Sequence, residues 1–387
     1  MLRRYRLKDY NFKLIFFLAA VSALGILLVG SAESSLQTRQ LFGVVLGFTF
    51  MIIVSLIDYS WILRFYWIIY VLNLFLLIWV LFMGKTTNGA SRWIQFGSDT
   101  TFTFQPIELC KILMILFFSM YLMKHEESLN KLKTFIKAIV LLLIPLILVI
   151  RQPDLKNTIT ITVVFCICIY VAGLSYKIIG GLILILIPLS FGVFFLITQT
   201  DLGIIDDYQK ERIMTFLDPE NEEYSDAVIQ QTNSVTAIGS GQLTGKGLNN
   251  NEVSTSNKGN FVAEIQTDFI FAVAGEELGF VGCFGILLLL FLIVLECILT
   301  GMRAKDTAGK VLCCGVGALI AVQSFINICV ATGLFPNTGT PLPFISYGLT
   351  SLVSLYIGAG FVLNVGLQNR KYYQEDLLHA KKQLRSW

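Results

Sequence analysis

The sequence predicts an all-α polytopic membrane protein with about ten transmembrane helices, cytoplasmic N- and C-termini and one large extracellular loop. Three observations predict this fold class: the composition, the lengths of the apolar runs and the distribution of Lys and Arg. Of the 387 residues, 55% are hydrophobic and only 14% are charged, and the mean hydropathy is +0.71. Because a chain of this composition cannot surround itself with polar surface, we expect it in a lipid bilayer.

Ten apolar runs are long enough to cross roughly 30 Å of hydrocarbon. The first follows a basic start and resembles a signal peptide, but further runs follow at once, which favours an uncleaved helix. In the eighth, the spanning part is expected at 279–299. The predicted spans are 14–30, 41–57, 62–83, 106–123, 134–150, 158–174, 178–198, 269–299, 311–333 and 350–367.

Ten spans place both termini on one side of the membrane, and the positive-inside rule assigns that side. Of the 29 Lys and Arg, 19 fall in segments on the side of the termini and five in the short opposite loops. Both termini are therefore predicted to be cytoplasmic. We expect one transmembrane domain over 1–387, with an extracellular loop at 199–268 between helices seven and eight and a cytoplasmic tail at 368–387.

The long loop is acidic in its first half and rich in Gly, Ser and Asn in its second. The second composition favours turns over regular elements. Long connections of this kind are usually functional or disordered, and this one leads directly into Asp268. We therefore predict a mobile loop over the entrance to a site.

The cysteines and histidines argue against several classes of site. All eight Cys lie in apolar runs without a neighbouring His, as is typical of small buried hydrophobes, and this argues against disulfides and zinc ligands. His125 and His379 lie in charged segments far from any ligand-like cluster, which argues against a metal-histidine centre and a Ser-His-Asp triad. The inverted repeat of many transporters is not visible, and no nucleic acid partner is expected.

A carboxylate at the mouth of the eighth span is the first candidate functional group. Asp268 precedes an apolar run at the boundary of water and lipid, where an acid is costly to hold. If the segment is helical, Glu264 and Asp268 share a face and one cleft. The alternative is that Thr267 and Asp268 cap a helix, because both residue types satisfy free N–H groups.

Other charged residues stand on the same predicted outer side. Glu108 and Lys111 have the spacing of an intrahelical ion pair, which either orients its helix or contacts a charged substrate group. Arg92 and Trp93 stand together in a loop, either as a site or as a lipid phosphate contact and an interfacial anchor.

Two outer segments are unusual in charge and in backbone. The short turn around Pro153 carries Arg151, Asp154 and Lys156, more charge than a simple turn needs. The stretch 332–351, TGLFPNTGTPLPFISYGLTS, has three Pro and three Gly at membrane depth, where irregular backbone is tolerated only inside protein or beside a wet cavity. We therefore predict a polar cleft that opens outward.

Six segments, in family order across nearly the whole chain, resemble motifs of the SEDS family (shape, elongation, division and sporulation), which includes RodA and FtsW. Jointly they are highly specific. Departures occur at Ile107, where the family usually has Ser, at Ala263, where it usually has Pro, and at Leu349-Thr350, where it usually has Gly-Ser. The matching segments are NGASRWIQFG at 88–97, QPIELCK at 105–111, RQPDLKNT at 151–158, AIGSGQLTGKGL at 237–248, TDFIFAVAGEELGFVG at 267–282 and PLPFISYG at 341–348.

This resemblance implies a peptidoglycan glycosyltransferase that polymerises lipid II at the outer face of the cytoplasmic membrane. It also implies a class B penicillin-binding protein as partner within a cell-wall synthesis complex. Asp268 occupies the position of the essential aspartate of the family, and we expect it to be catalytic. The candidate substrate-binding residues are Arg92, Trp93, Glu108, Lys111, Arg151, Asp154 and Glu264.

The chemistry of lipid II fits a single carboxylate. Its sugar is carried on a diphosphate, a leaving group that needs no protonation, whereas a glycosidase needs paired carboxylates. We expect Asp268 to accept the proton of the attacking sugar hydroxyl, with inversion at the anomeric carbon. Arg92, Lys111, Arg151 or a divalent cation, Mg²⁺ or Mn²⁺ with ligands that the sequence does not identify, could stabilise the departing diphosphate; no organic cofactor is expected.

Three alternatives stay open at the level of sequence. A flippase for lipid-linked precursors would suit the buried charges and the outward cavity as well as a polymerase does. A scaffold for a cell-wall complex, without catalytic activity, is a further interpretation. Within the family, the opening YRLKDYNFKL and the pair Asp58-Tyr59 look more like RodA, which acts in elongation and cell shape. Lys258 is placed roughly as in many FtsW chains, which act at the division septum.

Overall fold

The computed structural model describes residues 10–87, 90–95, 103–178, 180–181, 184, 225–249 and 265–368. Most of the predicted seventh span at 178–198, the first part of the predicted extracellular loop and the predicted tail beyond residue 368 lie outside the described residues. Glu264 and the side chain of Arg92 lie outside them as well.

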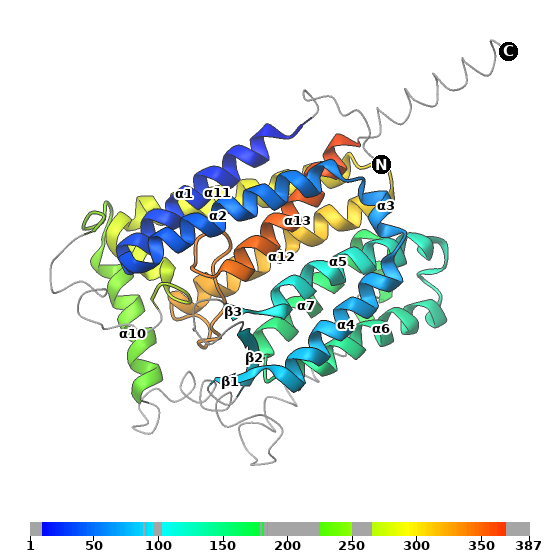
Figure 1. The fold of residues 1–387 in the computed structure, drawn as a ribbon, viewed down its shortest axis with the longest axis horizontal. Helices are drawn as coiled ribbons and strands as arrows, with labels where there is room; N and C mark the ends of the chain where they lie inside the picture. Colours follow the sequence, from blue (N-terminus) through cyan, green and yellow to red (C-terminus); the bar gives the residue numbers. More distant parts are fainter. Residues whose placement is uncertain are drawn as a thin grey trace, which may run out of the picture.

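The described chain is a bundle of long apolar helices (Figure 1), which confirms the predicted all-α membrane class, while the count of about ten spans and the side of the termini stay predictions. Eight of the described helices are long and apolar enough to cross a membrane, and α7 is a shorter apolar helix. The helices are α1 (Phe12–Ala32), α2 (Ser34–Leu56), α3 (Tyr59–Leu63), α4 (Tyr66–Met83), α5 (Pro106–Lys124), a 3-10 turn (Glu126–Ser128), α6 (Leu132–Ile150), α7 (Leu155–Val171), α10 (Ser225–Ser240), α11 (Ile270–Met302), α12 (Thr307–Ala331) and α13 (Leu349–Leu367).

Three helices form the centre of the bundle. In the apolar windows of α5, α12 and α13, 78%, 72% and 67% of the residues are buried inside the protein, against 28–39% for the other five candidate spans. α12 packs against α11, α7, α5 and α13, so it touches both halves of the chain. Polar side chains on α12 are therefore shielded from lipid by neighbouring helices.

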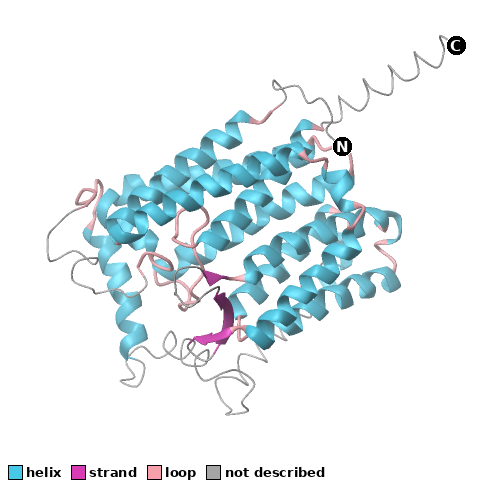
Figure 2. Cartoon of the chain, in the orientation of Figure 1, coloured by secondary structure: helices cyan, strands magenta, loops and turns pink. Residues whose placement is uncertain are grey.

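Two local features differ from the predicted spans. The predicted third span is divided into the short α3 and the long α4, and the Asp58 carboxylate accepts a hydrogen bond from the Ser60 N–H at the start of α3. The connection from α4 to α5 adds a small antiparallel sheet of β1 (Lys85–Thr87), β2 (Ala90–Gln95) and β3 (Thr103–Phe104) (Figure 2).

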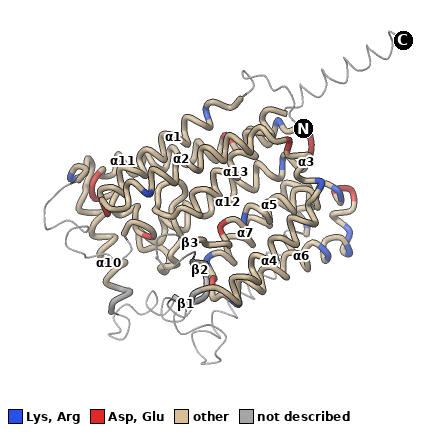
Figure 3. Tube along the Cα trace, in the orientation of Figure 1, with Lys and Arg blue, Asp and Glu red and all other residues tan. Residues whose placement is uncertain are grey.

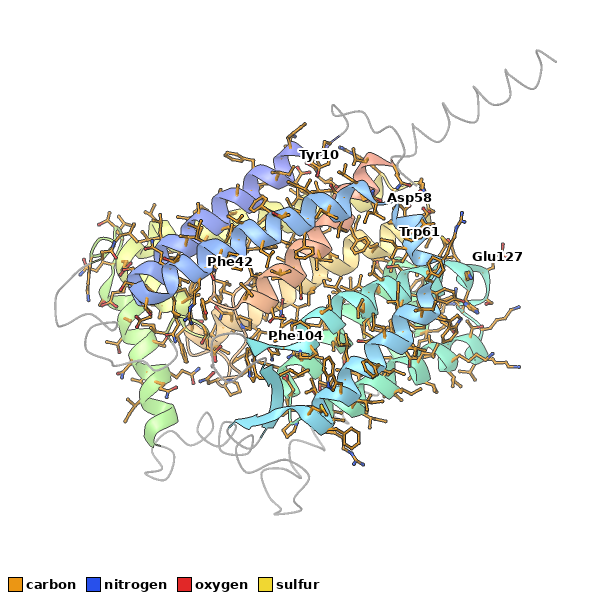
Figure 4. The ribbon with its side chains drawn as sticks, in the orientation of Figure 1. Tyr10, Phe42, Asp58, Trp61, Phe104 and Glu127 are labelled. Carbon is orange, nitrogen blue, oxygen red and sulfur yellow. The ribbon has the colours of Figure 1, made fainter. Side chains whose placement is uncertain are left out.

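The two ends of the bundle differ in charge. Lys and Arg gather at the end that carries α3 and the connection from α5 to α6 (Figure 3). Tyr10, Asp58, Trp61 and Glu127 all lie at this end, whereas Phe42 and Phe104 lie away from it (Figure 4). The segments expected on the side of the termini thus share one end of the bundle. Which end faces the cytoplasm stays a prediction.

A polar cluster holds the connection from α11 to α12 at this end. The Tyr59 hydroxyl donates to Asp306 at 2.9 Å, and Lys305 donates to Ser60 and Gln368 at 2.7 and 2.5 Å. Burial, with the neighbouring Asp306 carboxylate, raises the pKa of Tyr59 well above its usual value. The hydroxyl therefore stays protonated and remains a donor.

Part of the predicted loop is a regular helix, and residues 241–249 after it form turns, as the composition rich in Gly, Ser and Asn predicts; the expected mobility of the loop stays a prediction. Residues 225–240 form α10, which packs against α11. The Gln231 amide donates to the Val330 and Phe335 carbonyls, and the Ser234 hydroxyl donates to the Ala331 carbonyl. α10 therefore satisfies carbonyl groups at the C-terminal end of α12, where a helix has no intrahelical donors left.

The segment after α10 supplies hydrogen-bond partners to α11 at the point where that helix is broken. Gly279 has φ +64°, so the helix is interrupted there, which agrees with the expected start of the spanning part. The Phe280 and Val281 N–H groups donate to Gln242 and Leu243. Residues 241–249, which we call the docking segment, also donate to α11: the Lys246 N–H donates to the Glu276 carbonyl at 2.9 Å, and the Gly247 N–H donates to the Glu277 carbonyl at 3.0 Å.

Glycine permits this close approach. A side chain at Gly241 would begin 1.9 Å from the Gly275 carbonyl oxygen, and one at Gly245 would begin 2.1 Å from the Glu277 carbonyl oxygen. The Lys246 ammonium then pairs with the Glu276 carboxylate at 2.8 Å. Backbone contact with α11 thus explains two glycines of the motif at 237–248, Gly241 and Gly245.

All eight cysteines are free, as predicted from their apolar surroundings. Seven are buried, but Cys166 on α7 is exposed. Cys166 and Cys168 lie on the same apolar helix, yet only Cys168 is buried. An apolar run therefore does not by itself predict which of its thiols point into the protein.

Candidate functional site

The site is built around the connection from α12 to α13, residues 332–348, which we call the crossing loop. Its backbone is irregular, yet Leu342, Phe344 and Ile345 are at most 1% exposed. The Gln40 amide on α2 donates to the Ile345 and Ser346 carbonyls, both at 3.3 Å. Of the two environments in which irregular backbone is tolerated at membrane depth, these residues have the first, burial in protein.

The crossing loop also passes close to α1. A side chain at Gly25 would begin 2.8 Å from Ile345 Cα and 2.8 Å from the Phe344 carbonyl oxygen. Phe344 itself has φ +64°, a conformation that non-glycine residues rarely adopt. The loop is therefore held in one arrangement by contacts on several sides.

Asp268 lies in a turn, residues 265–269, and not on a helix. The helix begins at Ile270, and no side chain caps it by a hydrogen bond. Both the predicted helical face shared with Glu264 and the capping alternative are therefore wrong for Asp268. Its side chain is partly exposed, and it has no hydrogen bond or ion pair to another residue in the described ranges.

The crossing loop holds the Asp268 turn by hydrogen bonds to the two residues that precede the aspartate. The Ser346 hydroxyl donates to the Thr267 carbonyl at 2.5 Å, and the Tyr347 N–H donates to the Gln266 carbonyl at 2.9 Å. On α12, the Asn327 amide donates to the Asp268 carbonyl at 2.8 Å and to the Thr340 carbonyl at 2.7 Å. The backbone of Asp268 is fixed while its carboxylate stays available.

A second set of polar groups connects α5 with the start of α7. Lys111 and Glu108, 2% and 3% exposed, form an ion pair at 2.8 Å, as their spacing predicts. The Lys111 ammonium also donates to the Asn157 side-chain oxygen at 3.1 Å. The Asn157 amide in turn donates to the Asp154 carboxylate at 2.8 Å, and Asp154 caps α7.

Lys156 joins these groups to the crossing loop. Its ammonium donates to the Gly339 carbonyl, one residue before the Thr340 that Asn327 holds. The structure thus links Asp268, through the crossing loop, to the polar groups of α5 and α7. It brings three predicted residues, Glu108, Lys111 and Asp154, into one hydrogen-bond network.

The other predicted site residues that the structure describes are not part of this hydrogen-bond network. Arg151 is exposed at the end of α6. Trp93 is partly buried in β2, opposite Lys85, and Arg92 precedes it in the same strand. Their substrate contacts, like that of Glu264, stay predictions.

Among the described residues, no three His, Cys, Asp or Glu side chains are placed to hold a metal ion. A resident metal with protein ligands alone does not fit this part of the chain, since such sites need several carboxylate, imidazole or thiolate donors. A cavity between α5, α6, α7 and α12 is apolar and has Lys111 at its edge, with Ile115, Phe118 and Phe165 among its lining residues. The predicted polar cleft stays a prediction.

The comparisons with known proteins agree on the family. The family model described as "Cell cycle protein", which groups FtsW, RodA and SpoVE, matches residues 7–371. The chain belongs to the SEDS family. This confirms the resemblance that six motifs carried.

Relatives of this SEDS protein include both branches of the family. It is 32% identical over 375 residues to "Probable peptidoglycan glycosyltransferase FtsW" of Geobacter metallireducens, covering 93% of this chain and 95% of the relative. It is also 32% identical over 351 residues to "Peptidoglycan glycosyltransferase MrdB" of Escherichia coli K12, covering 90% of each chain.

Solved structures share the fold of the SEDS protein. A chain from a peptidoglycan synthase complex that coordinates polymerization and crosslinking matches with a TM-score of 0.74 and 26% identity, over 94% of this chain and 99% of that one. The rod shape determining protein RodA of Thermus thermophilus matches with a TM-score of 0.67 and 25% identity, over 92% and 96%. With the apolar helices, these matches identify a multi-pass protein of the cytoplasmic membrane.

Sequence reasoning about the SEDS protein missed two asparagines. Asn157 stands within the motif at 151–158, of which only the charged residues were singled out from the sequence. Asn327 stands in the C-terminal third of the predicted span 311–333, in the run QSFINICV. An amide inside a transmembrane helix is costly unless it is hydrogen-bonded, so this residue type at that depth was the available signal.

We expect Lys111→Met to destabilise the SEDS protein more than the double variant Glu108→Gln/Lys111→Met. The single change leaves the Glu108 carboxylate buried without its cation, which typically costs about 3–5 kcal/mol. Thermal unfolding in detergent measures the difference. Equal destabilisation by the single and double variants would contradict the prediction.

Proposed function

We propose that this SEDS protein, a peptidoglycan glycosyltransferase, polymerises lipid II with Asp268 as the general base. The observation that carries the proposal is the state of that one side chain. Its backbone is held by Asn327, while its carboxylate is partly exposed and has no partner among the described residues. A general base has to be fixed in position and free to accept a proton.

The reaction is a single displacement. The hydroxyl oxygen of the acceptor sugar attacks the anomeric carbon of the donor, and the bond from that carbon to the diphosphate oxygen breaks with its electron pair. The hydroxyl proton passes to the Asp268 carboxylate. Because one displacement occurs, the configuration at the anomeric carbon inverts. The diphosphate leaves as an anion without an acid to protonate it.

Positive charge near the departing diphosphate favours the transition state. Lys111 is a weak candidate for direct contact, since its charge is already balanced by Glu108 at 2.8 Å and its side chain is 2% exposed. This arrangement favours the interpretation in which the pair orients α5. Arg92 and Arg151 stay the proposed direct contacts.

A divalent cation, Mg²⁺ or Mn²⁺, is proposed as a companion of the substrate rather than as a resident ion. Mg²⁺ is commonly bound by substrate phosphates with only one or two protein carboxylates. Such an ion would not need a cluster of three protein ligands. No step above depends on it.

The proposed partner is a class B penicillin-binding protein. The related chain from a peptidoglycan synthase complex that coordinates polymerization and crosslinking supports this proposal. Crosslinking is a reaction that the carboxylate of Asp268 does not perform, so a second active site has to supply it.

Within the family we propose an elongation role of the RodA type. The opening YRLKDYNFKL and the pair Asp58-Tyr59 support it, whereas Lys258 favours a septal role of the FtsW type. The relatives do not separate the two, since both branches are 32% identical to this chain.

Asp268→Ala is expected to lower lipid II polymerisation by the purified protein by at least about 10²-fold, because the attacking hydroxyl loses its base. Glycan strands made in detergent are measured on gels. Asp306→Asn, a carboxylate change at the opposite end of the bundle, is the control and should retain activity. A wild-type protein that makes no glycan without a vesicle would instead support the flippase alternative, and full activity of Asp268→Ala would refute the assignment of the base.

Chelation tests the proposed cation. We expect EDTA to reduce polymerisation by the wild-type protein and added Mg²⁺ or Mn²⁺ to restore it, because the diphosphate of lipid II loses its counter-charge. The thermal midpoint should not change, since no resident ion is proposed. Unchanged polymerisation in EDTA would remove the cation from the proposal.

The cellular role is tested by location. A fluorescent fusion of this protein should distribute along the lateral cell wall during growth, as an elongation enzyme would. Collection at the division septum would show that the septal alternative is right. A fusion of the Asp268→Ala variant serves as the control that location does not depend on catalysis.

A further inference from the structure

Asn327 is the one residue that touches both the backbone of the proposed base and the crossing loop through the same side chain, within the described part of the chain. It lies on α12, the helix that contacts both halves of the bundle, and is 0% exposed. Its Nδ2 atom donates to the Asp268 carbonyl at 2.8 Å and to the Thr340 carbonyl at 2.7 Å.

The chemistry of the two partners fixes the orientation of this amide. Main-chain carbonyl oxygens only accept hydrogen bonds, so the group that faces both of them has to be the –NH₂ group. Both hydrogens of that group are used. The Oδ1 atom then points elsewhere and has no hydrogen-bond partner among the described residues.

An unpartnered buried oxygen is unfavourable, because a lost hydrogen bond to water is not replaced. Asn327 therefore carries a cost that an apolar residue at this position of α12 would avoid. The residue does not stand alone: Gln323 and Ser324, one turn earlier on α12, also have a buried polar atom without a partner in the described ranges. This face of α12 is polar where the helix passes the Asp268 turn.

The two acceptors belong to different parts of the site. Asp268 carries the proposed base, and Thr340 follows Gly339, which accepts the hydrogen bond of Lys156 from α7. The amide therefore sets the position of the base relative to the crossing loop and to the polar groups at the start of α7. A shift of about 1 Å between a base and its substrate can reduce a rate by roughly 10².

We propose that Asn327 is a positioning residue for the Asp268 base. It does not touch substrate; it holds the Asp268 carbonyl and the crossing loop in one geometry so that the carboxylate meets the attacking hydroxyl. This inference rests on the proposed function of Asp268. It predicts a loss in the chemical step rather than in substrate binding.

The chain offers a matched control in Asn364 on α13. Asn364 is also 0% exposed, and its amide donates to the Ser55 carbonyl at 2.7 Å while its oxygen accepts from the Tyr59 N–H at 2.9 Å. It lies beside α3, at the end of the bundle away from the site. Leu has the same number and branching of side-chain heavy atoms as Asn, so a change to Leu removes the hydrogen bonds without opening a cavity.

The test compares Asn327→Leu and Asn364→Leu in the full chain, with kcat and KM measured on lipid II in detergent. For Asn327→Leu we expect kcat to fall by about 10–100-fold with KM within about threefold of wild type, since the base is displaced but the substrate contacts remain. For Asn364→Leu we expect kcat within about threefold of wild type. Asn327→Ser, which keeps one donor, should lie between Asn and Leu, and it replaces Asn327→Leu if that variant does not fold.

Hydrogen exchange gives a readout that does not need activity. Peptides covering 265–269 and 336–342 should exchange faster in Asn327→Leu than in wild type, and should be unchanged in Asn364→Leu. The proposal is overturned if Asn327→Leu keeps its kcat, if only KM changes, or if Asn364→Leu loses kcat equally. An inactive wild type, or an active Asp268→Ala, would instead overturn the proposed function itself.

Discussion

The structure depends on one constraint: backbone N–H and C=O groups at membrane depth have to be satisfied by protein, because hydrocarbon offers no partners. Two irregular stretches meet this constraint in this bundle. The crossing loop is satisfied by side chains from α2, α7 and α12, and the break at Gly279 is satisfied by the docking segment. Both stretches can therefore exist without unfolding the helices beside them.

The break in α11 has a consequence for Asp268. Residues 270–278 form a short helical piece between the Asp268 turn and Gly279, and almost all of this piece is buried. The docking segment holds its far end by hydrogen bonds, and the crossing loop and Asn327 hold its near end. The proposed base thus immediately precedes an element that is fixed at both ends, and precise positioning of a catalytic group requires such support.

Charge in the bundle follows from burial. Glu108 and Lys111 are nearly inaccessible and are paired with each other. Asn157 accepts a hydrogen bond from Lys111 and donates one to Asp154, so it connects the pair to α7. Buried ions of this kind persist only when they are paired and hydrogen-bonded. Asp268 differs because its side chain is partly exposed and the hydrogen bond that it receives from the Asn327 amide goes to its backbone carbonyl. The contrast separates groups that hold helices together from a group that remains available for proton transfer.

The sequence by itself determined the membrane class, the eight candidate spans and the shorter helix α7 that the described residues contain, the Glu108–Lys111 pair and the candidate base. Hydropathy, helical spacing and motif order are local properties of the chain. The sequence could not determine that Asp268 lies in a turn, that Asn327 holds it, or that residues 225–240 form a helix. Those features arise from hydrogen bonds between segments far apart in sequence, such as Asp268 with Asn327 and Gln242 with Phe280. Only the tertiary structure decides which distant groups satisfy one another.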